Sequence, residues 1–281
     1  MKATCRLCGL EKKLRQSHFI PKFVTNWIKE TSATGFLRQA INPEKRIQDG
    51  IKKFFLCSDC EITFSKYESY FANNFFYPHM NKKQESFEYN SNLKRFIVSV
   101  NWRILADNID NFEKNNPNWK SPLRHAESIW RDYLLGNKTD IGEYRIHLFF
   151  LDYIVNHNDN LPNKFQFYTL RGIDGTIYYN KELVHIYGKL PGFIIFSTIY
   201  PTNPEGWINT EIFDSGKINV PQEISYPGFG DFLKDRARLI DTAKISRREN
   251  TRITESILKN KDRSMRSRSA EVFKAEEQRE K

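Results

Sequence analysis

The cysteines constrain the fold of this chain more than any other feature. All four occur in two pairs with the same two-residue spacing, Cys5-x-x-Cys8 and Cys57-x-x-Cys60. A Cys-x-x-Cys turn places two thiolates at two corners of a tetrahedron, so two such turns complete a four-coordinate site for Zn²⁺. Four unrelated reduced thiols are the alternative, and the matched spacing argues against them. The sequence therefore predicts a structural zinc site made by Cys5, Cys8, Cys57 and Cys60.

The N-terminal segment MKATCRLCGLEKK bears on the compartment of the protein. It is charged from its start and lacks the apolar stretch of a secretory signal. We therefore expect a cytoplasmic protein, in which disulfides are disfavoured and cysteines remain free to bind a metal. The chain contains no apolar run of about 18 residues, the length that crosses a bilayer, so we expect no membrane-spanning helix and no membrane partner.

Composition favours a polyanionic partner. The chain has 281 residues, a formal net charge of +10, a pI near 9.3 and 14% aromatic residues. Lysine and arginine release counterions from phosphates, and aromatic rings stack on bases, so nucleic acid is the expected partner, with DNA and RNA both open. The sequence contains no P-loop, dinucleotide-binding or G-x-S-x-G motif, so NTPase, dinucleotide-enzyme and acyl-hydrolase functions have no support.

We predict an α+β fold in three parts. Residues 1–80 form a zinc-stapled module, residues 81–231 combine helices with an antiparallel sheet, and residues 232–281 form a basic C-terminal helix or a disordered tail. Between Lys244 and Arg268, nine Lys or Arg residues accompany three acidic residues. This charge fits a solvated helix that frays into a disordered tail, or an arm that contacts phosphates.

Local patterns in the N-terminal module predict its elements. Pro21 ends a short strand and precedes an amphipathic helix. Asp49-Gly50 predicts a hairpin turn between Ile47 and Phe54, which would lead the strand KKFFLC into the second cysteine pair. Aromatic residues at helical spacing after that pair predict a helix over EITFSKYESYFANNFF.

The remainder of the chain changes from helical to strand patterns. Residues 86–136 predict buried helices, and Gly136 ends the last of them as a C-cap would. Short aromatic and β-branched runs separated by turns then predict an antiparallel sheet. The six runs are EYRIHLFFLDYIV, KFQFYTLRG, TIYYNKE, LVHIYGK, GFIIFSTIY and INTEIFDSG.

Two motifs together suggest a family. The run SHFIP (residues 17–21) follows the first cysteine pair, and LCSDC (residues 56–60) opens a helix. This arrangement resembles the ββα-metal motif of HNH endonucleases in their zinc-stapled, treble-clef form, over about residues 5–79. The resemblance implies that His18 is the general base that takes a proton from water, while a divalent metal stabilises the scissile phosphate and the leaving oxygen. Stand-alone bacterial proteins with such a module look like defence or mobile-element proteins, so the resemblance implies that context too.

The chemistry of His18 supports the same role without the resemblance. An imidazole accepts a proton near neutral pH, as hydrolysis of a phosphodiester requires, and a strand that leaves a zinc knuckle is a stiff support. The alternative is a structural histidine that caps the knuckle or hydrogen-bonds a core carbonyl.

The sequence also departs from the family pattern. Glu61 follows the second cysteine pair where a metal-binding histidine is usual, and Ser17 stands where a ligand often precedes the base. The middle asparagine of the family is absent from its usual place; Asn42 lies far upstream, and Asp49 is nearer. Glutamate is a good ligand for Mg²⁺ or Mn²⁺, so metal binding by Glu61 is compatible with this change.

Two further residues could extend a cation site. Glu68 lies seven residues after Glu61, on the same helix face, and His79 follows the end of that helix. With His18 they would form a mixed histidine and carboxylate site for one hard cation. For Glu61 the alternative is an acid that stabilises the helix N-terminus, and for Glu68 and His79 it is a structural role.

The leading hypothesis is a metal-dependent HNH-like endonuclease that hydrolyses phosphodiester bonds, with His18 and Glu61 catalytic, Zn²⁺ structural, and Mg²⁺ or Mn²⁺ catalytic. The alternative is a non-catalytic zinc-finger protein that binds nucleic acid or another protein on a degenerate HNH scaffold. A third hypothesis is a structural subunit whose aromatic sheet docks a protein partner or forms a homo-oligomer.

Overall fold

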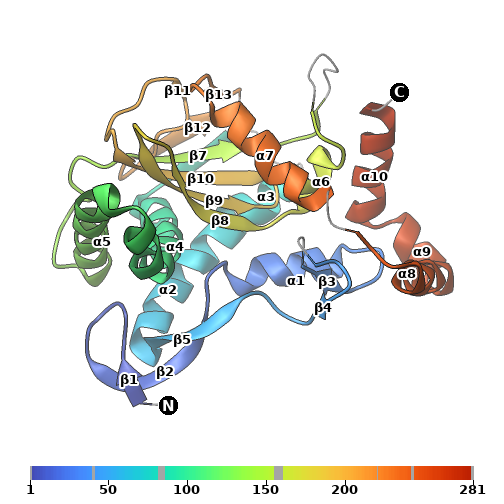
Figure 1. Cartoon of the computed structure of the whole chain (residues 1–281), viewed down its shortest axis with the longest axis horizontal. Helices are drawn as coiled ribbons and strands as arrows, with labels where there is room; N and C mark the ends of the chain where they lie inside the picture. The colour runs from blue at the N-terminus through green and yellow to red at the C-terminus, as the bar shows by residue number, and fades with distance from the viewer. Residues whose placement is uncertain are drawn as a thin grey trace.

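The computed structural model, shown in Figure 1, describes residues 2–39, 42–81, 86–154, 161–219, 221–241 and 244–279. The chain mixes helices and sheets, as expected for the α+β class. Its N-terminal part is a three-stranded antiparallel sheet with the strand order β1-β2-β5. The strands are β1 (Lys2–Thr4), β2 (Glu11–His18) and β5 (Lys52–Cys57).

The segment between β2 and β5 carries structure of its own. Strand β2 ends at His18, three residues before the predicted break at Pro21. Pro21 is the N-cap of α1 (Lys22–Glu30), so the helix begins where the sequence predicts. The short strands β3 (Leu37–Arg38) and β4 (Arg46–Ile47) pair with each other. The predicted Asp-Gly hairpin is therefore wrong, because β4 pairs with β3 while β5 pairs with β2. Asp49 and Gly50 connect two separate pairs of strands.

Helix α2 (Ser58–Phe71) begins directly after β5 and continues through the π-helical turn η1 (Ala72–Phe76) into α3 (Tyr77–Met80). The aromatic residues that predicted it, Phe64, Tyr67, Phe71 and Phe75, are all buried. Among them, Phe71 stacks on a phenylalanine of α4 with ring centroids 4.0 Å apart. Helix α2 thus joins the N-terminal sheet to the centre of the molecule (Figure 1).

Helix α4 (Ser91–Asn115) is the central element of the core. Most of its residues over the first four turns are buried, including Trp102 and the charged Arg103. It packs against α2, against α5 (Lys120–Leu135) and against the large sheet. Gly136 ends α5 with φ of +80°, which confirms the predicted C-cap.

The large sheet is antiparallel, with the order β7-β10-β9-β8. Four predicted runs form its strands, β7 (Ile146–Phe150), β8 (Asp174–Tyr179), β9 (Val184–Leu190) and β10 (Phe193–Tyr200).

Two of the six strand predictions were wrong or only partly right. The run KFQFYTLRG forms the helix α6 (Phe165–Arg171). Five of the seven residues of α6 are buried, and burial of a helix is tertiary packing that the strand propensity of the residues does not predict. The run INTEIFDSG contributes only the ends of short strands. These belong to small two-stranded sheets made by β11 (Trp207–Ile208) with β13 (Glu223–Ile224), and by β12 (Gly216–Asn219) with β6 (Ser86–Tyr89).

The C-terminal region is helical through residue 279 and folds back on the rest of the chain, as the right side of Figure 1 shows. Of the two alternatives for the basic tail, the structure has the helical one, in three helices between Arg247 and Arg279. Arg263 donates to the carbonyl of Lys29, and Arg268 donates to the carbonyl of Met80. The helices are α7 (Phe229–Asp241), α8 (Arg247–Lys259), α9 (Lys261–Met265) and α10 (Arg268–Arg279).

The main hydrophobic core runs without interruption from the cysteine cluster to the large sheet, between Cys5 and Ile218. The N-terminal sheet is therefore supported by α2 and α4 and not by its own side chains alone. The division into three parts at residues 80 and 231 stays a prediction. None of the helices in the described ranges combines the length and the apolar composition needed to cross a membrane.

Candidate functional site

The four cysteines come together at one end of the N-terminal sheet. Cys5 and Cys8 lie in the turn between β1 and β2, Cys57 ends β5, and Cys60 lies in the first turn of α2. Their Sγ atoms all lie within 4.8 Å of one another. The Sγ atoms of Cys5 and Cys60 are 3.7 Å apart, and those of Cys8 and Cys57 are 3.9 Å apart.

These spacings suit a metal ion such as zinc. A tetrahedral Zn²⁺ with Zn–S bonds of about 2.3 Å requires sulfur atoms about 3.8 Å apart. All four cysteines are free thiols, and three of them are buried. The predicted cysteine cluster is thus confirmed as a group that could hold a metal ion.

The electrostatics of the cluster are compatible with a bound cation. Burial disfavours a charge on Cys5, but backbone N–H groups, including that of Cys57 at 3.3 Å, outweigh it and lower the pKa of Cys5. Burial raises the pKa of Cys60, and the neighbouring thiols add to the rise. Four thiolates in this space would repel one another, and a bound cation removes that repulsion.

His18, the last residue of β2, pairs with Asp49 from the loop between β4 and β5. Nε2 of His18 lies 2.9 Å from Oδ2 of Asp49. The side chains are 18% and 23% exposed, so the pair is partly open to solvent. Burial disfavours the charge of Asp49, but hydrogen bonds from His18, Gly50 N–H and Lys52 outweigh burial and lower its pKa to about 2.

Arg103 supports this pair from the core. Its guanidinium, 2% exposed, reaches out of α4 and donates from Nη1 to the backbone carbonyl of His18 at 2.7 Å. Nη2 lies 2.8 Å from Oε1 of Glu68, in an ion pair whose angles fall short of a well-aligned hydrogen bond. Nε donates to the carbonyl of Ser99. A buried arginine thus fixes the backbone of His18 and one carboxylate of α2 at the same time.

Glu61 and Glu68 lie on one face of α2, and Glu68 is connected to the His18 backbone through Arg103. Burial raises the pKa of Glu68, and the charge of Glu61 adds to the rise. The ion pair with Arg103 and the nearby His18 lower the pKa in part but do not cancel the rise. Glu61 and His18 thus each lie within electrostatic range of Glu68. Oε1 of Glu61 is buried and has no hydrogen-bond partner among the described residues. An unpartnered carboxylate oxygen is an available ligand for a cation or a donor.

Other candidates lie elsewhere or are occupied. Nε2 of His79 is 3.0 Å from the carbonyl of Leu151, and the His79 ring packs edge-on against Phe150 and Phe193, in surroundings separate from the His18 cluster. Ser17 is buried, and its hydroxyl accepts a hydrogen bond from the backbone N–H of Leu56. Its hydroxyl is therefore buried and engaged by the backbone, in a poor position for a metal ligand.

Sequence reasoning missed Arg103 and did not select Asp49. Arg103 is a cation inside the apolar run RFIVSVNWRILA, and a charge in such a run is a signal of a buried ion pair. Asp49 carried a weaker signal, its position in the loop before the second cysteine pair. Its partner could not be read from the sequence, because His18 lies 31 residues away.

Comparison with known proteins adds no relative to these observations. No family model, curated protein or solved structure matches the chain.

Proposed function

We propose that this protein is a metal-dependent nuclease of the HNH type that hydrolyses phosphodiester bonds in nucleic acid. The observation that carries the proposal is the His18–Asp49 pair, which is partly open to solvent, together with the unpartnered carboxylate oxygen of Glu61 in the first turn of α2. Such an oriented imidazole is what activation of a water molecule requires. The net charge of +10 favours a polyanionic substrate.

In this proposal His18 is the general base. Because Nε2 donates its hydrogen to the Asp49 carboxylate, the other ring nitrogen, Nδ1, is the proton acceptor. Asp49 remains ionised at neutral pH, since its pKa is about 2, and it stabilises the imidazolium that forms when His18 takes the proton. The bond from Arg103 to the carbonyl of His18 holds the backbone at the end of the strand, while Asp49 orients the ring.

Glu61 is the residue we assign to a catalytic cation. A carboxylate oxygen is a hard ligand and suits Mg²⁺ or Mn²⁺. When bound, such a cation would stabilise negative charge on the phosphate and the leaving oxygen. Glu68 is better assigned to positioning, because its charge is already opposed by Arg103 at 2.8 Å.

The cysteine cluster has a structural role in this proposal, as a zinc site in a treble clef. The first cysteine pair precedes β2, which ends at His18, and the second pair lies at the junction of β5 and α2, directly before Glu61. Zinc would therefore fix the relative positions of the base and the cation ligand. A defence or mobile-element context stays an expectation from the resemblance.

The test is cleavage of plasmid DNA and of a structured RNA with Mg²⁺ or Mn²⁺. His18→Ala should reduce the rate by on the order of 10²- to 10⁴-fold. His125→Ala is the matched control, because His125 is a part-buried histidine bonded to Tyr144 in another part of the fold, and it should cleave like wild type. Asp49→Asn should lower the rate while zinc content stays unchanged. Equal cleavage by His18→Ala and wild type would refute the assignment of His18.

A second function has one specific observation in its favour. The hydroxyl of Ser17 is already used by the backbone, so the cation would lose a ligand that the family pattern provides. A binding protein on a degenerate scaffold would tolerate this loss. It predicts that neither His18→Ala nor wild type cleaves, that both bind nucleic acid or a protein equally, and that loss of zinc abolishes binding.

A further inference from the structure

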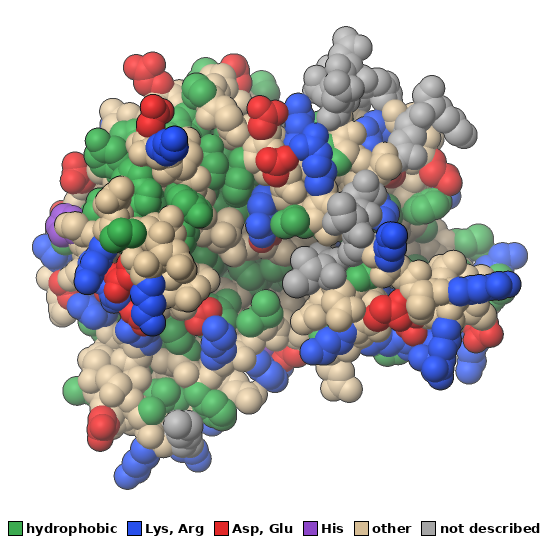
Figure 2. All heavy atoms as spheres, in the orientation of Figure 1, with side chains coloured by type: hydrophobic (Ala, Val, Ile, Leu, Met, Phe, Trp, Pro, Cys, Tyr) green, Lys and Arg blue, Asp and Glu red, His purple; other side chains and the backbone are tan. Residues whose placement is uncertain are grey.

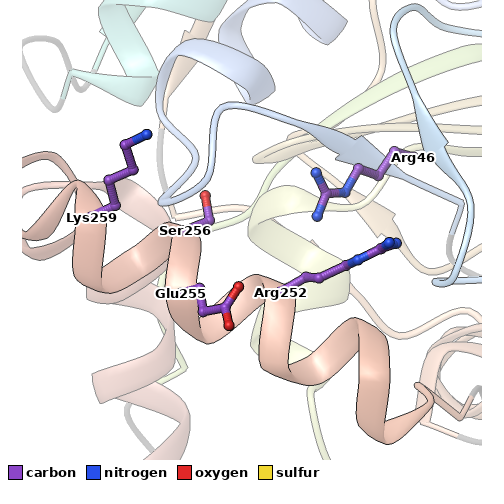
Figure 3. Close-up of a pocket in the computed structure, with 5 residues that line it drawn as sticks. All are labelled: Arg46, Arg252, Glu255, Ser256 and Lys259. Atoms are coloured by element: carbon purple, nitrogen blue, oxygen red, sulfur yellow. The ribbon is translucent and has the colours of Figure 1, made fainter.

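A basic hollow lies between β4 and the C-terminal helix α8 (Figure 3). It has a volume of about 360 Å³ and is lined by Arg46 from β4 and by Arg252, Glu255, Ser256 and Lys259 from α8. The helical residues recur at intervals of three and four, so they share one face of α8. Segments about 200 residues apart in the chain thus build one concave surface with three cationic side chains.

One buried carboxylate holds three arginines in place beside the hollow. Glu249, whose side chain is 6% exposed, accepts hydrogen bonds from Arg38 at 2.7 Å, Arg46 at 3.1 Å and Arg252 at 3.3 Å. Three guanidinium groups therefore share one carboxylate. The hydrogen bonds from these arginines, that from Arg38 first, lower the pKa of Glu249 to about 2, so it stays ionised.

The arginines keep donors for a further anion. Arg46 and Arg252 have side chains that are 37% and 52% exposed, and Arg46 also lies over the ring of Phe36, which restricts its position. Lys259 is exposed, and Glu255 is the acidic residue of the lining. With Arg38 and Glu249 included, four cations meet two carboxylates, so the hollow has a net positive charge.

The hollow is close to the His18 cluster. Arg46 and Asp49, the partner of His18, are three residues apart in one segment, so their Cα atoms are at most about 11 Å apart. Each strand of a DNA duplex carries a phosphate per roughly 3.4 Å of axis, so this separation corresponds to at most about three nucleotides. Two further lysines contact this segment at its Asp49 end: Lys29 donates to the carbonyl of Gln48, and Lys52 donates to Asp49.

We propose that this hollow is a phosphate-binding subsite that holds the backbone of a nucleic acid across α8 and β4, with Arg46, Arg252 and Lys259 as the phosphate contacts. It rests on the proposed function in one respect, that the bound strand continues to His18. Guanidinium forks match the geometry of phosphate oxygens, and the contacts would be independent of base sequence. Figure 2 shows Lys and Arg side chains gathered over α8 and α9, at the right of the view.

The experiment measures binding separately from cleavage. Wild type, Arg252→Gln/Lys259→Gln and Ser256→Glu are titrated against a fluorescein-labelled DNA duplex and a labelled RNA hairpin, without added divalent cation, between about 50 and 200 mM salt. Ser256→Glu leaves every arginine in place and adds a negative charge to the hollow. Lys138→Gln/Lys181→Gln removes the same charge from the turn after α5 and the turn between β8 and β9, and is the matched control.

The double variant should bind more weakly and lower the salt slope of log K by about 2 for the duplex, since each phosphate contact contributes about 0.9. Ser256→Glu should also weaken binding, while the control should match wild type. Equal loss in the double variant and the control would overturn the subsite, as would no binding of either probe by wild type. Full competition by millimolar inorganic phosphate at constant ionic strength would show a small-anion site and also overturn it.

These outcomes are independent of the proposed activity. If the double variant loses binding while wild type does not cleave, the subsite stands and the nuclease assignment fails. If wild type cleaves through His18 and the double variant binds normally, the nuclease stands and the subsite fails.

Discussion

The replacement Arg103→Met tests the link between the core and the candidate site. Methionine keeps much of the volume of the buried arginine stem but removes its charge and its donors. The carbonyl of His18 then loses its donor at 2.7 Å, and Glu68 loses its cation at 2.8 Å. Both losses occur at groups that are buried or nearly so.

The expected cost follows from these two contacts. Removing one partner of a buried ion pair costs roughly 3 to 5 kcal/mol, and because Glu68 is 20% exposed we take the lower end. A buried carbonyl left without its donor adds about 1 kcal/mol. The total is about 4 kcal/mol of unfolding free energy, which a domain with roughly 5 to 15 kcal/mol survives in a weakened state.

The cost should also depend on pH. Burial already raises the pKa of Glu68 above its ordinary value of 4.5, and removing Arg103 raises it further. A carboxyl whose pKa is higher in the folded state than in the unfolded state binds more protons when folded, so stability falls as pH rises above 4.5. The difference between Arg103→Met and wild type should therefore be smaller near pH 5 than near pH 7.

Urea unfolding followed by circular dichroism at both pH values measures these terms. Adding Glu68→Gln to Arg103→Met should recover about 2 kcal/mol at neutral pH, because no unpaired charge remains. Arg95→Met on the same helix is the control; Arg95 lies over the ring of Tyr133, and its loss should cost under about 1 kcal/mol. A pH-independent loss in Arg103→Met, with no recovery in the double variant, would refute the reasoning.

Two further predictions concern metal removal and acid. Each chain should contain one zinc ion by elemental analysis. A strong chelator or Cys57→Ala should unfold the N-terminal module, since structural zinc contributes on the order of 10 kcal/mol or more to such modules. Thermal unfolding that is unchanged by chelation would contradict this prediction. Burial lowers the pKa of His147, and likewise of His185, to about 3. Both folded pKa values lie below the ordinary 6.5, so the contribution of these histidines to stability should be complete above pH 6.5 and fall towards pH 3, by about 4 to 5 kcal/mol for each. The urea midpoint of His185→Gln should therefore fall less steeply with acid than that of wild type. A parallel decline in wild type and variant would count against this prediction.

Local sequence was sufficient for several elements. The spacing of aromatic residues predicted α2. Gly136 predicted the end of α5, because glycine readily adopts the positive φ that the structure shows there. These features depend on neighbours within a few residues, where side-chain periodicity and backbone sterics act directly. The run that forms α6 failed the same method, because its aromatic residues fit a strand as well as a buried helix.

The sequence by itself determined the cysteine cluster, because two matched turns allow few arrangements other than a shared metal. It also identified His18 as the candidate base. Only the tertiary structure gave His18 its partners: Asp49, 31 residues away, holds the ring, and Arg103, 85 residues away, holds the backbone. It likewise brought α8 against β4, through the ion pair of Arg46 with Glu249, 203 residues apart. Such contacts depend on how helices and strands pack around a common core, and no local pattern of residues encodes that packing.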